Sequence, residues 1–371
     1  MKRLAILSTH PIQYNSPLFR MLQDKDDLNL HVFFSKTWNQ VKYDPDFQQE
    51  VVWDIPVFEG YKHSTFDADT ITGKRQLTQA IHSFGPDALL VYGWNFPGHL
   101  HVMRKLKGHI PIWFRGDSHL LDPLSFWKKA LRKALLTWVY RHTDLVFSVG
   151  TANTDYFLWT GLDAEQIIMA PHAADNDFYS SPPASAPSSK ELRIQWNIPL
   201  DQKVILFAGK FEEKKQPGFL LQAWRALNEP RPYLIFAGNG PLLYQIENEA
   251  KTEAKIRVVG FINQSKMPAL YRCADLFCLP SLGPGETWGL CINESIASGT
   301  PCLVSSRAGC SKDLAPSDWV RALDPTDVGL WSKEIQNTFE QKERNQTWRT
   351  QFLQRHAHQA FATSLTKELK R

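Results

Sequence analysis

A glycine-rich turn with two carboxylates lies in the second half of the chain, within LFCLPSLGPGETWGLCINESIASGTPCLV at Leu276–Val304. The helix predicted from about Gly289 directs backbone N–H groups and the positive end of its dipole at this turn, which suits a phosphate. Glu286 in the turn and Glu294 in the helix would repel a phosphate, but carboxylates readily accept hydrogen bonds from sugar hydroxyls. The stretch therefore predicts a site for a molecule with both phosphates and hydroxyls. The alternative is an ordinary turn with two solvated glutamates.

Two further turns follow apolar runs in the same half, GKFEEKK at Gly209–Lys215 and GNGP at Gly238–Pro241. Lys210 and Lys215 suit a pyrophosphate, because two lysines near a helix N-terminus stabilise the charge that builds up on a phosphate leaving group. Taken alone, the lysines would be two solvated charges. One phosphate-bearing ligand, however, explains all three turns, since ligands of parallel α/β sheets bind where strands end.

Short apolar runs without alternation are typical of buried parallel strands. In the first half they are Leu4–Ser8, Leu28–Phe34, Ala88–Tyr92, Ile110–Phe114, Leu145–Val149 and Ile167–Ala170; in the second half they are Val204–Ala208, Tyr233–Ala237, Ile256–Val259, Leu276–Leu279 and a run from Pro301. Helical segments separate these runs, so the sequence predicts an α/β protein with doubly wound parallel sheets.

With 371 residues the chain is long enough for two domains. A proline- and serine-rich stretch, SSPPASAPSSK at residues 180–190, predicts a linker, which we place at 181–191. We therefore expect a Rossmann-like domain at 1–180, completed by a C-terminal helix at 350–371, and a second one at 192–349. In the first domain, polar and aromatic side chains follow three of the strands. They are His10, Gln13, Trp94, Asn95, Arg115, Asp117 and His119.

The composition, 43% hydrophobic and 22% charged, is that of an ordinary globular protein. A net charge of +4 is too small to favour nucleic acid as a partner. Five cysteines without a C-x-x-C pair predict free thiols in a reducing compartment. The N-terminal apolar run is too short for a signal peptide, and no run reaches the length of a bilayer. These observations predict a cytoplasmic protein.

The second half resembles retaining glycosyltransferases of family 4, the glycosyl transferases group 1, over about residues 203–306. The motifs that carry the resemblance are Gly209-Lys210-Phe211 with Lys215, Gly238-Asn239-Gly240-Pro241, Tyr271-x-x-Ala274-Asp275, Leu279-Pro280-Ser281, Glu286-Thr287-Trp288-Gly289-Leu290, Asn293-Glu294 and Ala297-x-Gly299-x-Pro301. The resemblance implies the GT-B architecture, in which two Rossmann-like domains face each other across a cleft.

The resemblance also implies a nucleotide-sugar donor, a UDP- or GDP-sugar, bound by the second domain. Lys210 and Lys215 would contact the diphosphate, Glu294 the ribose, and Glu286 the donor sugar. The implied donor-binding residues are Gly209, Lys210, Lys215, Gly238, Asn239, Thr287, Trp288, Gly289, Leu290 and Glu294. The family usually has arginine in place of Lys210; lysine keeps the charge but loses the bidentate geometry. Glu286 and Lys215 are the implied catalytic residues of this domain.

The first domain departs from the family, which often has histidines after the strands at Ala88–Tyr92 and Ile110–Phe114. Asp117 and His119 are the residues here that would face the reacting centre as catalytic groups. His119 is alternatively a structural loop histidine. Arg115 would bind an acceptor phosphate or form an ion pair. The acceptor-side residues are then His10, Gln13, Asn15, Trp94, Asn95 and Arg115.

We expect no metal and no other cofactor. The Asp-x-Asp pairs of the chain do not follow apolar strands as those of metal-dependent transferases do, and two lysines with a helix end can neutralise the diphosphate instead. The predicted activity is retaining transfer of a hexose-type sugar to a saccharide acceptor, lipid-linked as one option, in the synthesis of cell-surface polysaccharide or glycolipid. The alternatives are a sugar epimerase of the same fold and a non-catalytic nucleotide-sugar-binding protein. A dinucleotide oxidoreductase would need G-x-G-x-x-G, and the GNGP turn lacks its third glycine.

One helical segment, SFWKKALRKALLTWVYRH at residues 125–142, is both basic and amphipathic. Its apolar side carries Trp127, Leu131, Leu135 and Trp138, and its first half carries Lys128, Lys129, Arg132 and Lys133. This pattern predicts peripheral contact with the cytoplasmic face of a membrane. The alternative is a helix that packs on the core with a charged outer face.

Overall fold

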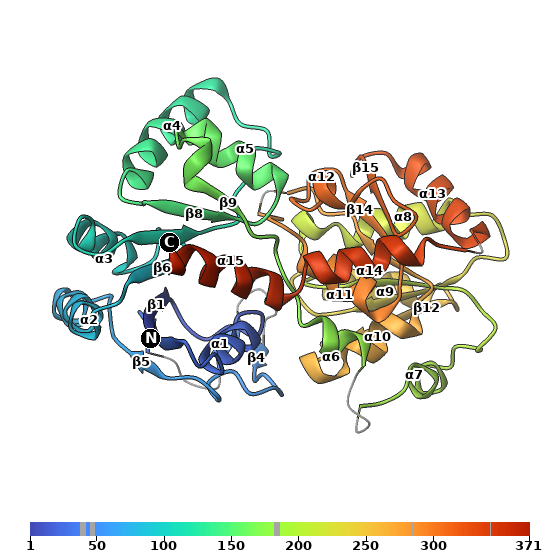
Figure 1. The fold of residues 1–371 in the computed structure, drawn as a ribbon. Helices are drawn as coiled ribbons and strands as arrows, with labels where there is room; N and C mark the ends of the chain where they lie inside the picture. The colour runs from blue at the N-terminus through green and yellow to red at the C-terminus, as the bar shows by residue number, and fades with distance from the viewer. Residues whose placement is uncertain (38–41, 45–48, 182–185, 284, 342) are drawn as a thin grey trace. The chain divides into compact units, whose positions relative to one another are not determined.

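The computed structural model describes residues 1–37, 42–44, 49–181, 186–283, 285–341 and 343–371, which fold into two compact units (Figure 1). The first unit contains Met1–Gln40, Pro56–Ala173 and Ala357–Arg371. The second contains Val41–Ile55 and Ala174–His356. Each unit is built around one parallel sheet.

The first unit has a seven-stranded sheet in which all neighbours run parallel. In spatial order the strands are β5 (His63–Thr65), β2 (Leu28–Phe34), β1 (Lys2–Ser8), β6 (Ala88–Tyr92), β7 (Ile112–Arg115), β8 (Leu145–Ser148) and β9 (Ile167–Met169). The helices are α1 (Ser16–Gln23), α2 (Ile71–Phe84), α3 (His99–Leu106), α4 (Phe126–Tyr140), α5 (Thr151–Thr160) and α15 (His358–Lys370).

Helices cover both faces of this sheet, because successive side chains of a strand point to opposite faces. Leu4 and Ile6 of β1 belong to a core that includes Phe361 and Leu365 of α15. The alternate residues of β1 belong to the opposite core, with side chains from α2, α3, α4 and α5. The C-terminal helix α15, dark red in Figure 1, packs against α1. The end of the chain thus completes the unit with which the chain begins.

The second unit has a six-stranded parallel sheet. In spatial order the strands are β12 (Ile256–Gly260), β11 (Tyr233–Ala237), β10 (Val204–Ala208), β13 (Leu276–Leu279), β14 (Cys302–Ser305) and β15 (Val320–Leu323). The helices are α6 (Asn176–Ser180), α7 (Ser189–Gln195), α8 (Pro217–Arg225), α9 (Leu243–Lys251), α10 (Met267–Cys273), α11 (Leu290–Ser298), α12 (Ser311–Leu314), α13 (Val328–Glu340) and α14 (Gln346–Arg355).

The strand order reverses direction once in each sheet, between β1 and β6 in the first unit and between β10 and β13 in the second. Such a switch point leaves a crevice at the carboxyl ends of the two strands, where ligands of doubly wound sheets bind. The loops that open there are those after Ser8 and Tyr92, and those after Ala208 and Leu279. The predicted α/β class with two doubly wound sheets is confirmed.

The predicted strands are present with ends shifted by a few residues, but the sequence pattern missed β5 and β15. Each is short and partly exposed, so neither forms an apolar run. The sequence pattern also missed the antiparallel pair β3 (Lys42–Asp44) and β4 (Gln49–Val51). This segment belongs to the second unit, where Asn263 Nδ2 donates to Val52 O at 2.6 Å and Ser265 N to Asp54 Oδ1 at 3.0 Å.

Besides the segment Val41–Ile55, which belongs to the second unit, the chain passes between the units near Ala173 and again near His356. Helix α6 precedes the predicted linker and belongs to the second unit, and α7 begins within that linker. Residues 182–185 of the linker lie outside the described part of the chain. Of the C-terminal segment predicted to complete the first unit, α15 does so and α14 packs in the second.

Two general expectations concern membrane spans and cysteines. Within the described ranges, no helix combines the length and apolarity that crossing a bilayer requires. All five cysteines are free thiols, and all except Cys291 are buried.

Two buried histidines predict that the first unit loses stability in acid. Burial lowers the pKa of His99 to about 4, and burial with the positive charge of Arg115 does the same for His358. In the unfolded chain both would titrate near their ordinary value of about 6.5, so between pH 6.5 and 4 the unfolded state binds more protons. Each histidine should therefore remove roughly 3 kcal/mol of stability as the pH falls through this window.

Urea denaturation between pH 7 and pH 4 measures this loss. The variant His99→Gln, although less stable at pH 7, should show a shallower decline over the window than the wild-type chain. An unchanged slope would mean that His99 does not carry the effect.

Candidate functional site

Two loops at the carboxyl edge of the second sheet interlock through backbone hydrogen bonds. The loop after β10 contains Gly209–Lys215 and the loop after β11 contains Gly238–Leu242. Phe211 N donates to Asn239 O at 2.9 Å, and Leu242 N donates to Phe211 O at 2.9 Å. A Cβ added to Gly238 would lie 1.9 Å from the carbonyl oxygen of Gly209, and the φ of Gly238 is 149°. Glycine is therefore required where these loops cross.

Gly238→Ala should destabilise the second unit by about 2 kcal/mol or more, because the residue has to leave a glycine conformation and push away a backbone oxygen. Thermal or urea denaturation measures the change. The matched control is Gly218→Ala in α8, where an added Cβ meets nothing within 4 Å. Alanine there should be neutral or stabilising. Equal effects of the two substitutions would contradict the close approach of the loops.

The loop after β13 joins the loop after β10 through charged and polar side chains. Lys215 Nζ forms an ion pair with Glu286 Oε2, and Ser281 Oγ donates to the same oxygen at 2.7 Å. The Gln216 amide donates to Pro280 O at 2.7 Å and to Pro325 O at 2.8 Å. Gln216 holds this position with a φ of 55°, unusual for a residue other than glycine. The two loops of the switch point are thus held together by side-chain contacts.

The ammonium group of Lys215 is held in its charged state. Burial alone would lower the pKa of Lys215, but the Glu286 carboxylate, with contributions from Cys291 and Glu212, raises that pKa above its ordinary value. The lysine is therefore fully protonated at neutral pH. A positive charge in a site with restricted water interacts strongly with an incoming anion.

A small cavity opens beside this ion pair. Its volume is about 190 Å³. It is lined by Lys210, Glu212, Lys214, Lys215, Ser281, Gly283, Gly285 and Glu286. The volume of this cavity is below that of a usual pocket for a whole small molecule, so the cavity suits one charged part of a larger ligand. Within the described ranges, no group of three His, Cys, Asp or Glu side chains is arranged to hold a metal ion. Metal independence stays a prediction.

Helix α11 begins directly after this loop. Gly289 has a φ of 97°, and a Cβ there would come within 3.0 Å of the Leu279 side chain. Trp288 is buried and donates from Nε1 to Asn293 Oδ1 at 2.9 Å. Cys310 N donates to Trp288 O at 3.1 Å. These contacts fix the backbone of Thr287–Leu290; its role in holding the donor sugar, which the family resemblance implies, stays a prediction.

Glu294 lies on α11 with only 2% of its surface exposed, and it accepts a 2.7 Å hydrogen bond from the Tyr271 hydroxyl. The structure therefore gives this carboxylate a buried partner beside the predicted donor site. Contact with a ribose stays a prediction.

In the first unit, five of the six predicted acceptor-side residues lie on the two loops of its switch point, whereas Arg115 ends β7. His10, Gln13 and Asn15 follow β1, and Trp94 and Asn95 follow β6. The sequence did not indicate His99, whose hydrogen bonds connect this region to Ser35. His99 is fully buried, with Nε2 2.9 Å from Ser35 Oγ and Nδ1 2.9 Å from Gly93 O.

Arg115 and His119 are buried in the first unit. Arg115 Nη1 donates to Ala170 O at 2.9 Å, and its guanidinium lies 3.8 Å from the ring centre of Phe361. Leu121 N donates to His119 Nδ1 at 3.2 Å, and the histidine is 4% exposed. These contacts favour structural positions for both side chains. Roles for Arg115 at the acceptor, and for Asp117 and His119 in catalysis, stay predictions.

For four residues that shape the predicted donor region, the sequence indicated no role. Ser281, Tyr271 and Asn293 occur in the motifs quoted above, and their hydrogen bonds to Glu286, Glu294 and Trp288 supply the reason for their types. Gln216 carried no sequence signal, because its partners are main-chain oxygens far away in the chain.

Two Rossmann-like units with this topology define the GT-B fold. Residues 188–352 match the family model described as "Glycosyl transferases group 1". The chain is 30% identical over 282 residues to the "Putative glycosyltransferase EpsF" of Bacillus subtilis (strain 168), with 74% of this chain and 72% of that protein covered. The chain belongs to the group 1 glycosyltransferase family, and it is a glycosyltransferase.

Two further proteins are similar to the chain at lower identity. The "Mannosylfructose-phosphate synthase" of Agrobacterium fabrum is 26% identical over 255 residues, which cover 65% of this chain and 54% of that protein. Among solved structures, HepE of Anabaena in complex with UDP and glucose superposes with a TM-score of 0.70 at 15% identity, and both chains are fully covered. At that identity the likeness shows the fold.

Proposed function

We propose that this glycosyltransferase moves a hexose-type sugar from a UDP- or GDP-sugar to a saccharide acceptor, with retention of the anomeric configuration and without a metal. The observation that supports it most is the cavity at the second switch point, where charged Lys215 lies against Glu286 and beside Lys210. HepE, which shares the fold, was solved with UDP and glucose. A diphosphate placed at the lysines would bring the donor sugar toward Glu286 and the ribose toward Glu294.

The proposed chemistry breaks the bond between the anomeric carbon and the diphosphate and forms a bond from that carbon to an acceptor hydroxyl oxygen. The hydroxyl proton passes to the departing phosphate, which lies on the face where the acceptor arrives, and the configuration is therefore retained. Lys215 and Lys210 stabilise the charge that develops on the diphosphate. Glu286 accepts hydrogen bonds from the donor sugar, since a carboxylate is a strong acceptor.

A thermal-shift panel of UDP, GDP, ADP, TDP and NAD, each with and without magnesium, tests the donor class. A ligand of the native state raises the melting temperature by mass action. We expect a shift with one nucleoside diphosphate, of equal size with and without magnesium. A shift with NAD alone, or with none of the five, would contradict the proposal. Once the donor sugar is known, the anomeric proton coupling of the product tests retention.

We further propose that α4 lies against the surface of an anionic membrane, which suits a lipid-linked acceptor. Four apolar side chains of this helix are exposed to solvent: Phe126 (75%), Trp127 (80%), Leu131 (75%) and Leu135 (47%). Its core contacts come instead from Leu136, Val139 and Tyr140. Lys128, Lys129 and Lys133 are exposed beside the apolar side chains. An exposed aromatic and aliphatic surface with lysines at its border is typical of interfacial helices.

The double variant Trp127→Ala/Leu131→Ala should bind vesicles of phosphatidylcholine with phosphatidylglycerol about tenfold more weakly than the wild-type chain, because the apolar area entering the interface is removed. Cosedimentation measures the binding. The control Ile194→Ala/Tyr244→Ala removes exposed apolar side chains elsewhere and should bind like the wild type. Equal binding by all three proteins would contradict membrane contact through α4.

A further inference from the structure

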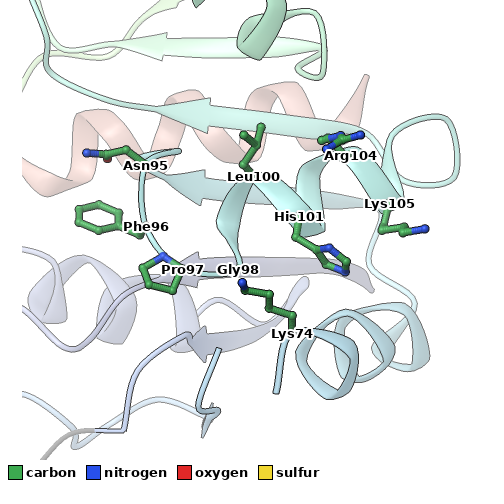
Figure 2. Close-up of a pocket in the computed structure, with 9 residues that line it drawn as sticks. All are labelled: Lys74, Asn95, Phe96, Pro97, Gly98, Leu100, His101, Arg104 and Lys105. Atoms are coloured by element: carbon green, nitrogen blue, oxygen red, sulfur yellow. The ribbon is translucent and has the colours of Figure 1, made fainter. Parts of the chain in front are cut away.

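A groove lined by basic side chains lies between α2 and α3 of the first unit (Figure 2). One cavity of about 530 Å³ is lined by Lys74, Asn95, Phe96, Pro97, Gly98, Leu100, His101, Arg104 and Lys105. A neighbouring cavity of about 750 Å³ shares Lys74, His101 and Lys105 with it and adds Ile71, Arg75, Thr78, Gln79, His82 and Leu106. We refer to the two together as the α2–α3 groove.

The charged side chains of the groove have one sign. Lys74 and Arg75 come from α2, and Arg104 and Lys105 come from α3. Among the described residues that line the groove there is no aspartate or glutamate, and these four cations form no ion pair with any described carboxylate. Like charges that line one groove repel one another, and an anionic ligand would relieve that repulsion.

The pKa of His101 is lowered both by burial and by this positive potential. Partial burial lowers the pKa of His101, and the charges of Lys105, Lys74, Arg104 and Arg75 lower it further. Four cations from two helices therefore act on one point inside the groove.

The groove also has an apolar end. In Figure 2, Phe96 and Pro97 lie at one end, Arg104 and Lys105 at the other, and Lys74 and His101 between them. Phe96 is 41% exposed, which leaves part of its ring accessible, and Asn95 beside it adds an amide. A ligand with an anionic group and a ring or chain attached to it would use both ends.

We propose that the α2–α3 groove is a second anion-binding site, in which Lys74, Arg104 and Lys105 hold a phosphate or diphosphate group. The group belongs either to a soluble phosphorylated saccharide or to a lipid headgroup. This site lies on the first unit, whereas the donor cavity lies on the second. The proposal does not depend on the function proposed above.

The test uses inorganic diphosphate and follows the His101 ring by NMR, with His101→Gln to assign its signal. Bound diphosphate neutralises the lysines, so the pKa of His101 should rise when diphosphate is added. Lys215→Met/Glu286→Gln, which removes two charges of the donor cavity, should leave this titration unchanged, and that result separates the two sites. Lys74→Gln/Lys105→Gln should lower the affinity for diphosphate, measured through the His101 signal, about tenfold or more, because two charge-assisted contacts are lost. The control Lys190→Gln/Lys333→Gln removes the same charge from exposed positions of the second unit.

An unchanged His101 pKa at saturating diphosphate, or equal affinity in wild type and Lys74→Gln/Lys105→Gln, would overturn the proposal. Vesicles with and without phosphatidylglycerol then separate the two sources of the phosphate. Weaker binding of the groove variant to anionic vesicles assigns the groove to a lipid headgroup. Unchanged vesicle binding, together with weakened diphosphate binding, assigns it to a soluble phosphorylated saccharide.

Discussion

Lys215→Ala should lower turnover by about 10²–10³-fold, the usual effect of removing one group that stabilises charge in a transition state. The donor KM should change much less, because the charge that Lys215 stabilises develops mainly as the sugar leaves. The matched control is Lys251→Ala, which removes an exposed lysine of α9 in the same unit. Steady-state kinetics with the donor identified in the thermal-shift panel measures both parameters. A wild-type turnover for Lys215→Ala would remove this residue from the catalytic site.

The same substitution should also destabilise the second unit, which has to be separated from the catalytic effect. It leaves the Glu286 carboxylate without its lysine at a position that is only 9% exposed. Because the Lys215 side chain keeps 23% exposure, we expect a loss of about 2–3 kcal/mol, less than for a fully buried pair.

The double variant Lys215→Met/Glu286→Gln removes both charges and should recover much of the stability while staying inactive. If activity returned along with stability, the effect of Lys215→Ala would be structural.

Glu294→Ala should raise the donor KM about 10–100-fold, the range expected when a hydrogen bond to a charged group is lost. The acceptor KM should stay near its wild-type value. Tyr271→Phe is the companion variant, because it removes the hydroxyl that donates to Glu294 and keeps the carboxylate. Its effect on the donor KM should be smaller.

A donor with deoxyribose distinguishes a ribose contact from a structural role for buried Glu294. If Glu294 holds a ribose hydroxyl, the wild-type chain should lose affinity for the deoxy donor, while Glu294→Ala should bind both donors alike. If Glu294→Ala weakens the two donors by the same factor, the carboxylate stabilises α11 and Tyr271 and does not contact the ribose.

Much of the structure around the proposed donor site could be predicted from the sequence because its signals are local. Buried parallel strands such as Val204–Ala208 are continuous apolar runs, and glycines such as Gly238 and Gly289 mark turns that other residues fit poorly. The motifs around Glu286 placed it in the loop after β13, and Lys215 in the loop after β10. The parallel order of the strands then brings these two loops to one edge of the sheet, so their meeting followed from the class of fold.

The rest depended on contacts between residues far apart in the chain. No local pattern shows that Phe361 of α15 lies over Arg115, or that Gln216 bonds to Pro280 and Pro325. The period of α4 is the same whether Trp127 and Leu131 face the core or solvent, and only the packing of Leu136 and Val139 decided that they are exposed.

The α2–α3 groove also depends on residues that are far apart in the chain. Each helix by itself carries ordinary surface lysines and arginines. The sequence thus determined the strands, the glycine turns and the charged loops of this protein, because short segments encode them. The tertiary structure alone decided which distant side chains share a space, because that depends on how the helices pack on the sheet.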